Sequence, residues 1–138
     1  MIANQSAEPP IEPRWLTVEM VLAIHDEQLA LLGGPEGVRD LGLLESGLAR
    51  PVNRHHYNPE TTIFELAAAY GFGIVKNHPF IDGNKRTGLL ALHGFLFLNG
   101  WRFDPDQVEE VQMILGLAAG DIEEDELARW VEGNSREA

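Results

Sequence analysis

One stretch of the chain, from Lys85 to about Leu98, is apolar on nearly every side of the helix that it would form. It is too short to cross a bilayer, and its apolar run is interrupted by His93 and Gly94. A helix that is apolar all round has to be surrounded by other elements. We therefore expect this stretch to be the central buried helix of a helical bundle, ended by the Asn-Gly pair at 99–100.

Capping residues and helix breakers divide the chain before this stretch into three further helices. Thr17 can cap the first, which the Gly-Gly-Pro run at 33–35 stops. Asp40 can cap a short second helix that ends at Pro51. After a polar loop over 51–60, a capping box of Thr62 and Glu65 begins the third helix, which reaches about Lys76.

Two more helices are expected after the apolar stretch. The Asp-Pro pair at 104–105 opens one that Gly120 ends, and Asp121 can cap a last, acidic one. Alternating strand patterns are absent, although 101–103 could be extended and the loop after the second helix could hold a small hairpin. The sequence therefore predicts an all-α fold of six helices with a small flap or hairpin.

The composition predicts one domain, because 138 residues with 44% hydrophobic and 23% charged side chains suffice for a single core. We expect a flexible arm over 1–14, the domain over 15–133 and a polar tail over 134–138. A net charge of −12 argues against direct nucleic-acid binding, and the lack of cysteine excludes disulfides. No signal peptide or membrane stretch is recognisable, so we expect a cytoplasmic protein without membrane contact.

The segment 78–88 (HPFIDGNKRTG) combines an irregular loop with the start of the apolar helix. Backbone N–H groups and the positive end of the helix dipole meet at such a junction, which favours anion binding. Gly83 lets the backbone approach a ligand, and Asn84 carries an amide donor. Lys85 and Arg86 add two positive charges. We therefore predict a phosphate-binding cradle here.

Two other side chains of this segment suit chemistry on a bound phosphate. Asp82 offers the hard oxygen that Mg²⁺ shares with phosphates. His78, at the start of the loop, can take a proton from a hydroxyl. A base, a metal ligand and an anion cradle within nine residues predict transfer from a nucleotide phosphate to a hydroxyl.

The run 78–86 resembles the signature of the Fic family, His-Pro-Phe-x-Asp/Glu-Gly-Asn-Gly/Lys-Arg, at every specified position. The stretches 15–19, 33–46 and 67–77 are similar to the death-on-curing (Doc) branch of that family. That branch supplies the toxins of toxin–antitoxin pairs. The likeness extends over 15–132, which is nearly the whole chain.

The resemblance implies the six-helix Fic core, with the signature loop between two central helices and a flap near 51–60 that aligns the target. It also implies a role for each matching residue. His78 would be the general base, Phe80 a buried anchor of the loop, and Asp82 the Mg²⁺ ligand. The residues expected to hold phosphates are Gly83, Asn84, Lys85 and Arg86.

Two positions distinguish the chain from nucleotidyl-transferring Fic proteins. Lys85 stands where they have a second Gly, and Leu89 stands where they have a second Arg. The Doc branch shares both features, which implies a kinase that uses ATP and Mg²⁺. Its γ-phosphoryl acceptor would be a threonine of elongation factor Tu, so that translation stops. AMP transfer through the same loop and a catalytically idle binding module remain alternatives.

The resemblance also implies a separate antitoxin, because the internal inhibitory helix of self-inhibited Fic proteins is not recognisable. We expect the antitoxin to lay a short helix into a groove beside the loop. His25 and His93 fall within expected helices and are interpreted as structural. His55 and His56 fall in the expected flap, and we interpret them as solvated or target-contacting rather than metal-binding.

Overall fold

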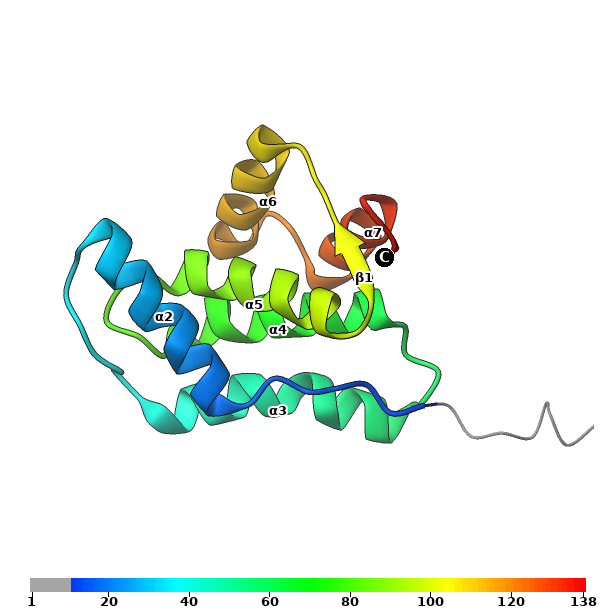
Figure 1. The fold of residues 1–138 in the computed structure, drawn as a ribbon, viewed down its shortest axis with the longest axis horizontal. Helices are drawn as coiled ribbons and strands as arrows, with labels where there is room; N and C mark the ends of the chain where they lie inside the picture. The colour runs from blue at the N-terminus through cyan, green and yellow to red at the C-terminus, as the bar shows by residue number, and fades with distance from the viewer. Residues whose placement is uncertain (1–10) are drawn as a thin grey trace, which may run out of the picture.

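The computed structural model describes residues 11–138, which form six helices and one two-stranded antiparallel sheet (Figure 1). This confirms the predicted helical class for the described residues, while positions 1–10 of the expected arm lie outside them. No helix in the described range is long and apolar enough to cross a membrane. The elements are α2 (Val18–Leu32), α3 (Leu41–Tyr57), α4 (Ile63–Asn77), α5 (Asn84–Leu98), β1 (Trp101–Phe103), α6 (Gln107–Ala119), α7 (Glu124–Gly133) and β2 (Ser135–Glu137).

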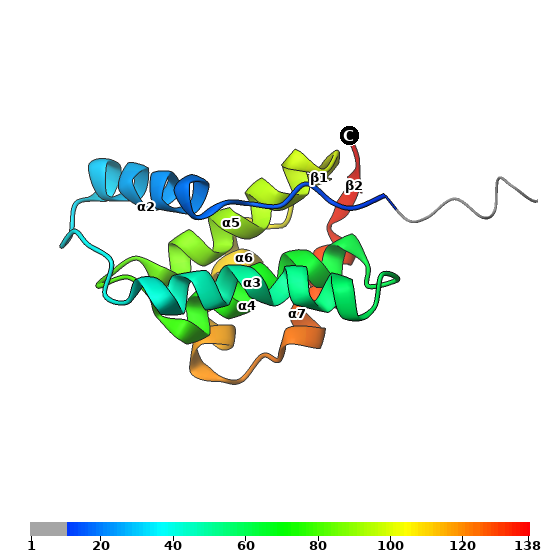
Figure 2. The ribbon, with the colours of Figure 1, turned by 90° about the horizontal axis from the view of Figure 1, so that it is seen from below.

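The centre of the fold is α4, which packs against α3, α5, α6 and α7 (Figures 1 and 2). Nine of its residues are buried, among them Tyr70 and Ile74. The prediction that 85–98 would be the central helix is therefore wrong. Helix α5 lies one layer out, where α2 covers only part of its outer face, and its Phe97 is 82% exposed.

Glycines allow α3 and α4 to approach closely. A Cβ atom at Gly73 would lie 2.8 Å from the carbonyl oxygen of Gly47, which is closer than real Cβ contacts. The small residues of the sequence 67–73 thus bring the two helix backbones together, as their composition indicates. This approach fixes where the C-terminal end of α4 emerges beside α3.

Helix α3 continues through Pro51 to Tyr57, so the predicted stop at Pro51 and the predicted loop or flap over 51–57 are wrong. Proline leaves the carbonyl four residues earlier without a helical donor. That carbonyl belongs to Gly47 and lies against α4 at the close approach. The added turns are held by Arg54, which bonds Glu124 of α7 at 3.0 Å.

The helix starts follow the predicted caps in three cases. Thr17 and Asp40 accept backbone bonds at the starts of α2 and α3, and the capping box of Thr62 and Glu65 begins α4. Two predicted starts are wrong by two residues. Asp106 rather than the pair 104–105 caps α6, and α7 begins after Glu123 without a side-chain cap.

The two ends of the domain are attached to the bundle. Residues 135–137, within the segment predicted as a polar tail, form β2 and pair with β1, whose extended form was predicted. At the other end, the N–H of Leu16 donates to the hydroxyl of Tyr70 at 2.9 Å. Burial raises the pKa of Tyr70 to about 12, so that this hydroxyl stays neutral and available as an acceptor at ordinary pH.

Candidate active site

The candidate site is built on the loop between α4 and α5, which begins at His78. His78 ends α4 in the left-handed conformation, with φ 53° and ψ 55°, and its N–H donates to Ile74 O at 3.1 Å. A non-glycine residue pays about 1–2 kcal/mol for this conformation. The turn leaves the His78 side chain exposed and sends the chain into Pro79 and Phe80.

The middle of the loop is fixed by a buried clamp. The Asn84 side chain accepts from Phe80 N–H and donates to Phe80 O, each at 2.9 Å. Phe80 is fully buried, and its ring stacks on His25 of α2 at 3.8 Å between centroids. His25 also bonds the backbone carbonyl of Asp82 through Nε2 at 2.8 Å. These contacts hold the backbone on both sides of Asp82.

The segment 33–40, between α2 and α3, holds the other side of the loop. Arg39 Nε donates to the His78 carbonyl at 2.8 Å, and Arg39 Nη2 donates to the Asn77 carbonyl at 3.1 Å. The Ile81 N–H donates to Gly37 O at 3.2 Å. The segment that covers this side of the loop is therefore 33–40, which we call the strap. The expectation of a flap near 51–60 is wrong, because most of that stretch is helix.

The loop and the start of α5 line a cavity of about 440 Å³, a volume within the range of small-molecule sites. It gathers the titratable side chains of the predicted site, and all of these are exposed on its wall. Helix α6 supplies most of the opposite wall. The lining residues are Val75, His78, Asp82, Gly83, Asn84, Lys85, Arg86, Leu89, Glu110, Val111, Ile114, Leu115 and Ala118.

The start of α5 has the properties of an anion site. Gly83 is its N-cap with φ 82°, a conformation that glycine adopts without strain, and no side chain caps the first turn. Lys85 and Arg86 are exposed, and neither forms a salt bridge with any residue of 11–138. In a chain with a net charge of −12, two such cations beside free helix N–H groups favour a bound anion.

The Asn84 side chain differs from its predicted use. Its oxygen and its amide nitrogen are both bonded to the backbone of Phe80, and the residue is 4% exposed. The side chain therefore fixes the conformation of the loop. The donor that remains for the predicted phosphate contact is the backbone N–H of Asn84, at the first position of α5. Phe80 is buried as the anchor role requires.

The oxygen donors of the site suit a magnesium ion that is shared with phosphates better than a cation that is bound by protein side chains alone. Asp82 contributes an exposed carboxylate to the cavity, and residues 11–138 contain no cluster of three or more His, Asp or Glu side chains suited to a metal. Mg²⁺ usually keeps several waters and is bound through one or two carboxylates together with substrate phosphates. The carboxylate of Asp82, next to the predicted phosphate cradle, matches that pattern.

Three residues that contact the site come from distant parts of the sequence and were not predicted. From the sequence, His25 is interpreted as structural, Arg39 lies within the stretch 33–46 that resembles the Doc branch but receives no role, and Glu110 is in no motif. The spacing of four residues places His25 on the same helix face as the apolar Val21, which is a sequence signal that His25 packs inward. His55 is buried in α3 against Trp15, and neither it nor His56 lines the cavity.

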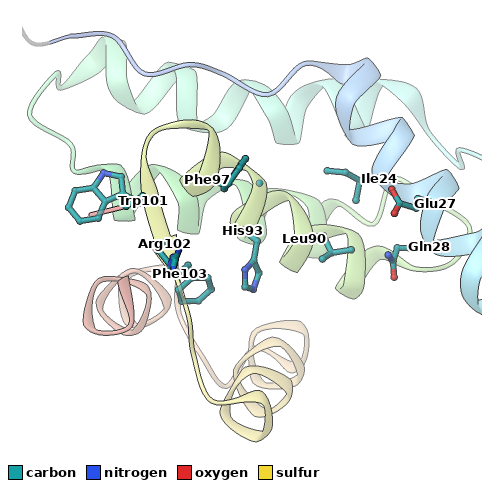
Figure 3. Close-up of a pocket in the computed structure, with 11 residues that line it drawn as sticks. Ile24, Glu27, Gln28, Leu90, His93, Phe97, Trp101, Arg102 and Phe103 are labelled. Atoms are coloured by element: carbon teal, nitrogen blue, oxygen red, sulfur yellow. The ribbon is translucent and has the colours of Figure 1, made fainter. Parts of the chain in front are cut away.

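A second cavity, of about 490 Å³, lies between α2, α5 and β1 (Figure 3). It contains none of the predicted site residues, and its lining is mostly apolar, including Ile24, Leu90 and the exposed Phe97. Figure 3 shows His93 extending from α5 beside Phe103 of β1, and their rings lie 4.6 Å apart. This cavity is a groove next to the site rather than part of it.

With a histidine, a carboxylate and two cations on one cavity, this helical bundle belongs to the class of all-α proteins that carry a charged loop site. Comparison with known proteins narrows that class. Residues 15–96 match the Fic/DOC family. The chain is 34% identical over 109 residues to "Protein kinase doc" of Escherichia phage P1, covering 79% of this chain and 86% of that protein.

A second relative is "Toxin Doc" of Mycolicibacterium smegmatis. It is 34% identical over 106 residues, which cover 73% of this chain and 80% of that protein. The family match includes the whole loop and its clamp, from His25 to Arg86. The chain belongs to the Fic/Doc family, as its signature run predicted.

Proposed function

We propose that this protein is the toxin of a toxin–antitoxin pair and a kinase that transfers the γ-phosphoryl group of ATP to a protein hydroxyl. The acceptor that we propose is a threonine of elongation factor Tu, whose modification would block translation. The observation that carries the proposal is one cavity with four site side chains exposed on it: His78, Asp82, Lys85 and Arg86. The names of the two relatives, a protein kinase and a toxin, support it.

In this proposal His78 acts as the general base. It takes the proton of the acceptor hydroxyl as that oxygen attacks the γ-phosphorus, while the bond from phosphorus to the β–γ bridging oxygen breaks and ADP leaves. The left-handed turn at His78 and the Arg39 bond to its carbonyl keep the imidazole at the cavity wall. Magnesium, when bound with the nucleotide, would neutralise charge on the phosphates, and Asp82 would hold it.

Lys85 and Leu89 favour phosphoryl transfer over AMP transfer. Both line the cavity, and Lys85 places a four-carbon stem and one charge where a glycine would leave room for deeply bound phosphates. Leu89 offers no charge to a terminal phosphate in that deep pose. The ammonium of Lys85 can instead pair with a γ-phosphate presented near His78, which supports the kinase.

The test is incubation of the protein and purified elongation factor Tu with ATP labelled separately at the α- and γ-phosphates. Mass spectrometry of the acceptor distinguishes a phosphate from an AMP adduct. We expect the γ-label alone to appear, and the Lys85→Gly variant to lose most of it. An AMP adduct made by the wild-type protein would contradict the steric argument, and no adduct with any nucleotide would favour the idle binding module.

We also propose an antitoxin as the partner, docked as an amphipathic helix in the groove of Figure 3. The mostly apolar lining of that groove, with Phe97 82% exposed, supports this proposal. Co-expression with the neighbouring small open reading frame should restore growth, and the product of that frame should co-purify with the protein. Replacement of Phe97 by Glu should abolish that rescue while leaving toxicity intact. Toxicity that no neighbouring gene relieves would argue against the partner.

A further inference from the structure

The strap at 33–40 joins α2 to α3 and runs beside the loop that precedes α5 (Figure 1). It approaches the side chain of Asp82, the predicted magnesium ligand, at Gly34. A Cβ atom at Gly34 would lie 3.2 Å from Oδ2 of Asp82, which is tighter than nine in ten real Cβ contacts. The position of this carboxylate therefore depends on the absence of a side chain at residue 34.

The backbone on both sides of Gly34 is bonded to the rest of the fold. The N–H of Gly33 donates to Leu29 O at 2.8 Å, and the carbonyl of Gly37 accepts from Ile81 N–H at 3.2 Å. A side-chain carbon of Leu29 lies 3.7 Å from the Cβ position of Gly34, so part of the space around it is already occupied. A side chain at residue 34 would therefore displace the aspartate carboxylate more easily than it would displace the strap.

The carboxylate of Asp82 is the part of this contact that can move. The residue is exposed, and its carboxylate forms no salt bridge with any residue of 11–138. The backbone of Asp82, by contrast, is held by the bond between its carbonyl and His25. The backbone thus brings Asp82 to the cavity, while the contact with Gly34 limits how its carboxylate can turn.

We propose that Gly34 is a positioning residue, which sets the orientation of the Asp82 carboxylate toward a magnesium ion bound with the nucleotide. The inference rests on the proposed function, in which Asp82 holds this ion. Mg²⁺ requires nearly ideal octahedral geometry with oxygen atoms at about 2.0–2.1 Å, whereas Ca²⁺ accepts longer distances and variable geometry. A carboxylate displaced by a few tenths of an ångström should therefore weaken the binding of Mg²⁺ much more than that of Ca²⁺.

The test measures binding rather than transfer. Calorimetry gives the Kd of β,γ-imido ATP with saturating Mg²⁺, with saturating Ca²⁺ and with EDTA, and comparison between variants cancels the affinity of each metal for the free nucleotide. In Gly34→Ala we expect the Kd with Mg²⁺ to rise about tenfold, as is typical when a residue that orients a metal ligand is changed. The Kd with Ca²⁺ should rise by less than about threefold. An unchanged Kd with EDTA would show that the variant is folded and its phosphate cradle intact.

Gly37→Ala is the matched control on the same strap. The φ angles of Gly34 and Gly37 are 118° and 117°, and a Cβ atom at Gly37 would also meet a neighbour at 3.2 Å, in this case Cδ1 of the exposed Ile81. Both variants should lower the melting temperature by similar amounts, because alanine is strained at positive φ. Gly37→Ala should nevertheless leave all three Kd values unchanged. Gly33→Ala, whose Cβ meets nothing within 4 Å, measures the effect of positive φ alone.

A double variant tests whether Gly34 acts through Asp82. In the Asp82→Asn background, Gly34→Ala should raise the Kd with Mg²⁺ no further, because the ligand that it displaces is already lost. Additive effects, or a Gly34→Ala variant whose Kd rises equally with Mg²⁺ and with EDTA, would overturn the role of Gly34 and leave the kinase proposal standing. A preference for Mg²⁺ that depends on Gly34, in a protein that transfers no phosphate, would contradict the proposed function and keep this inference.

Discussion

At the N-terminal end of α4, charged side chains are bonded to one another, whereas at its C-terminal end they face a cavity and form no salt bridge with any residue of 11–138. At the first end, Glu65 and Glu124 share Arg54, at 3.4 Å and 3.0 Å, and Glu124 also bonds Arg50. At the second end, side-chain bonds go to the backbone instead, from His25, Arg39 and Asn84.

The difference shows that charged side chains stabilise the fold at the N-terminal end of α4, whereas at its C-terminal end they are exposed on the cavity. Ion pairs among Arg50, Arg54, Glu65 and Glu124 join α3, α4 and α7, and their charges are largely compensated within the fold. At the loop end, the side-chain hydrogen bonds fix the backbone, and Lys85 and Arg86 form no salt bridge within the described part of the chain. Removing a charge should therefore cost stability at the first end and activity at the second.

The largest effect is expected at His78. The variant His78→Ala should lower the rate of transfer by ~10²–10⁴-fold, because general-base catalysis contributes about that factor and no second histidine lines the cavity. Its melting temperature should not fall, since the imidazole is exposed and only the backbone of His78 is bonded. Rate assays on a purified acceptor and thermal unfolding check both halves. A wild-type rate in this variant would remove His78 from its role.

The next effect concerns Asp82 and magnesium. In Asp82→Asn, we expect the magnesium concentration for half-maximal activity to rise by at least about tenfold, because a neutral amide is a poor ligand for a hard cation. The fold should persist, since the Asp82 carboxylate is exposed and His25 bonds its backbone carbonyl rather than its side chain. Magnesium titrations of both proteins measure the shift. Superimposable titration curves would mean that the ion is held elsewhere.

The clamp between the Asn84 side chain and the Phe80 backbone should affect both stability and activity, so it does not follow the difference between the two ends of α4. Asn84→Ala leaves the N–H and C=O of buried Phe80 unbonded, and each unsatisfied buried group costs about 1–3 kcal/mol. We expect a lower melting temperature together with a lower kcat. The matched comparison is His25→Phe, which keeps a ring against Phe80 but loses the bond to Asp82 O, and it should also lower kcat. The variant His25→Gln carries a donor again, so its kcat should lie between those of His25→Phe and the wild type.

The smallest effect is expected at the paired end. Glu124→Gln should lower stability by about 1 kcal/mol, because it weakens bonds to two arginines that are only partly exposed. Transfer activity should stay within about twofold of the wild type, since no lost contact reaches the cavity. Denaturant unfolding and the rate assay together test this. A large loss of activity with little loss of stability would erase the distinction between the two ends.

Local signals predicted the fold where local chemistry decides it. The caps at Thr17, Asp40 and Thr62 marked three helix starts because a cap bonds its own helix. The prediction that α3 ends at Pro51 is wrong, because the contacts that stabilise the helix beyond this residue come from α4 and α7, which are distant in the sequence. The pairing of β2 with β1 was equally hidden, because three-residue strands joined across α6 and α7 leave no pattern.

The same division holds for the candidate site. Its motif residues are contiguous in the chain, so their spacing alone placed them on one loop. Contributions from α2, α6 and the strap at 33–40 depend on packing, which no local pattern encodes. Asn84 illustrates the limit, since its residue type fits a phosphate donor and only the turn at Phe80 shows that its side chain is used inside the loop.

Under the proposed function, the positions of Lys85 and Arg86 also affect how quickly the anionic nucleotide binds. Lys85 and Arg86 act over short range, whereas the net charge of −12 repels a polyanion over a longer one. Screening shortens that range to about 10 Å at 0.1 M salt, which weakens the distant repulsion before the local attraction. The association rate constant for ATP should therefore rise with ionic strength at first. Most sites that bind anions through positive charge show the opposite trend, so stopped-flow measurements in graded salt would reveal this arrangement directly.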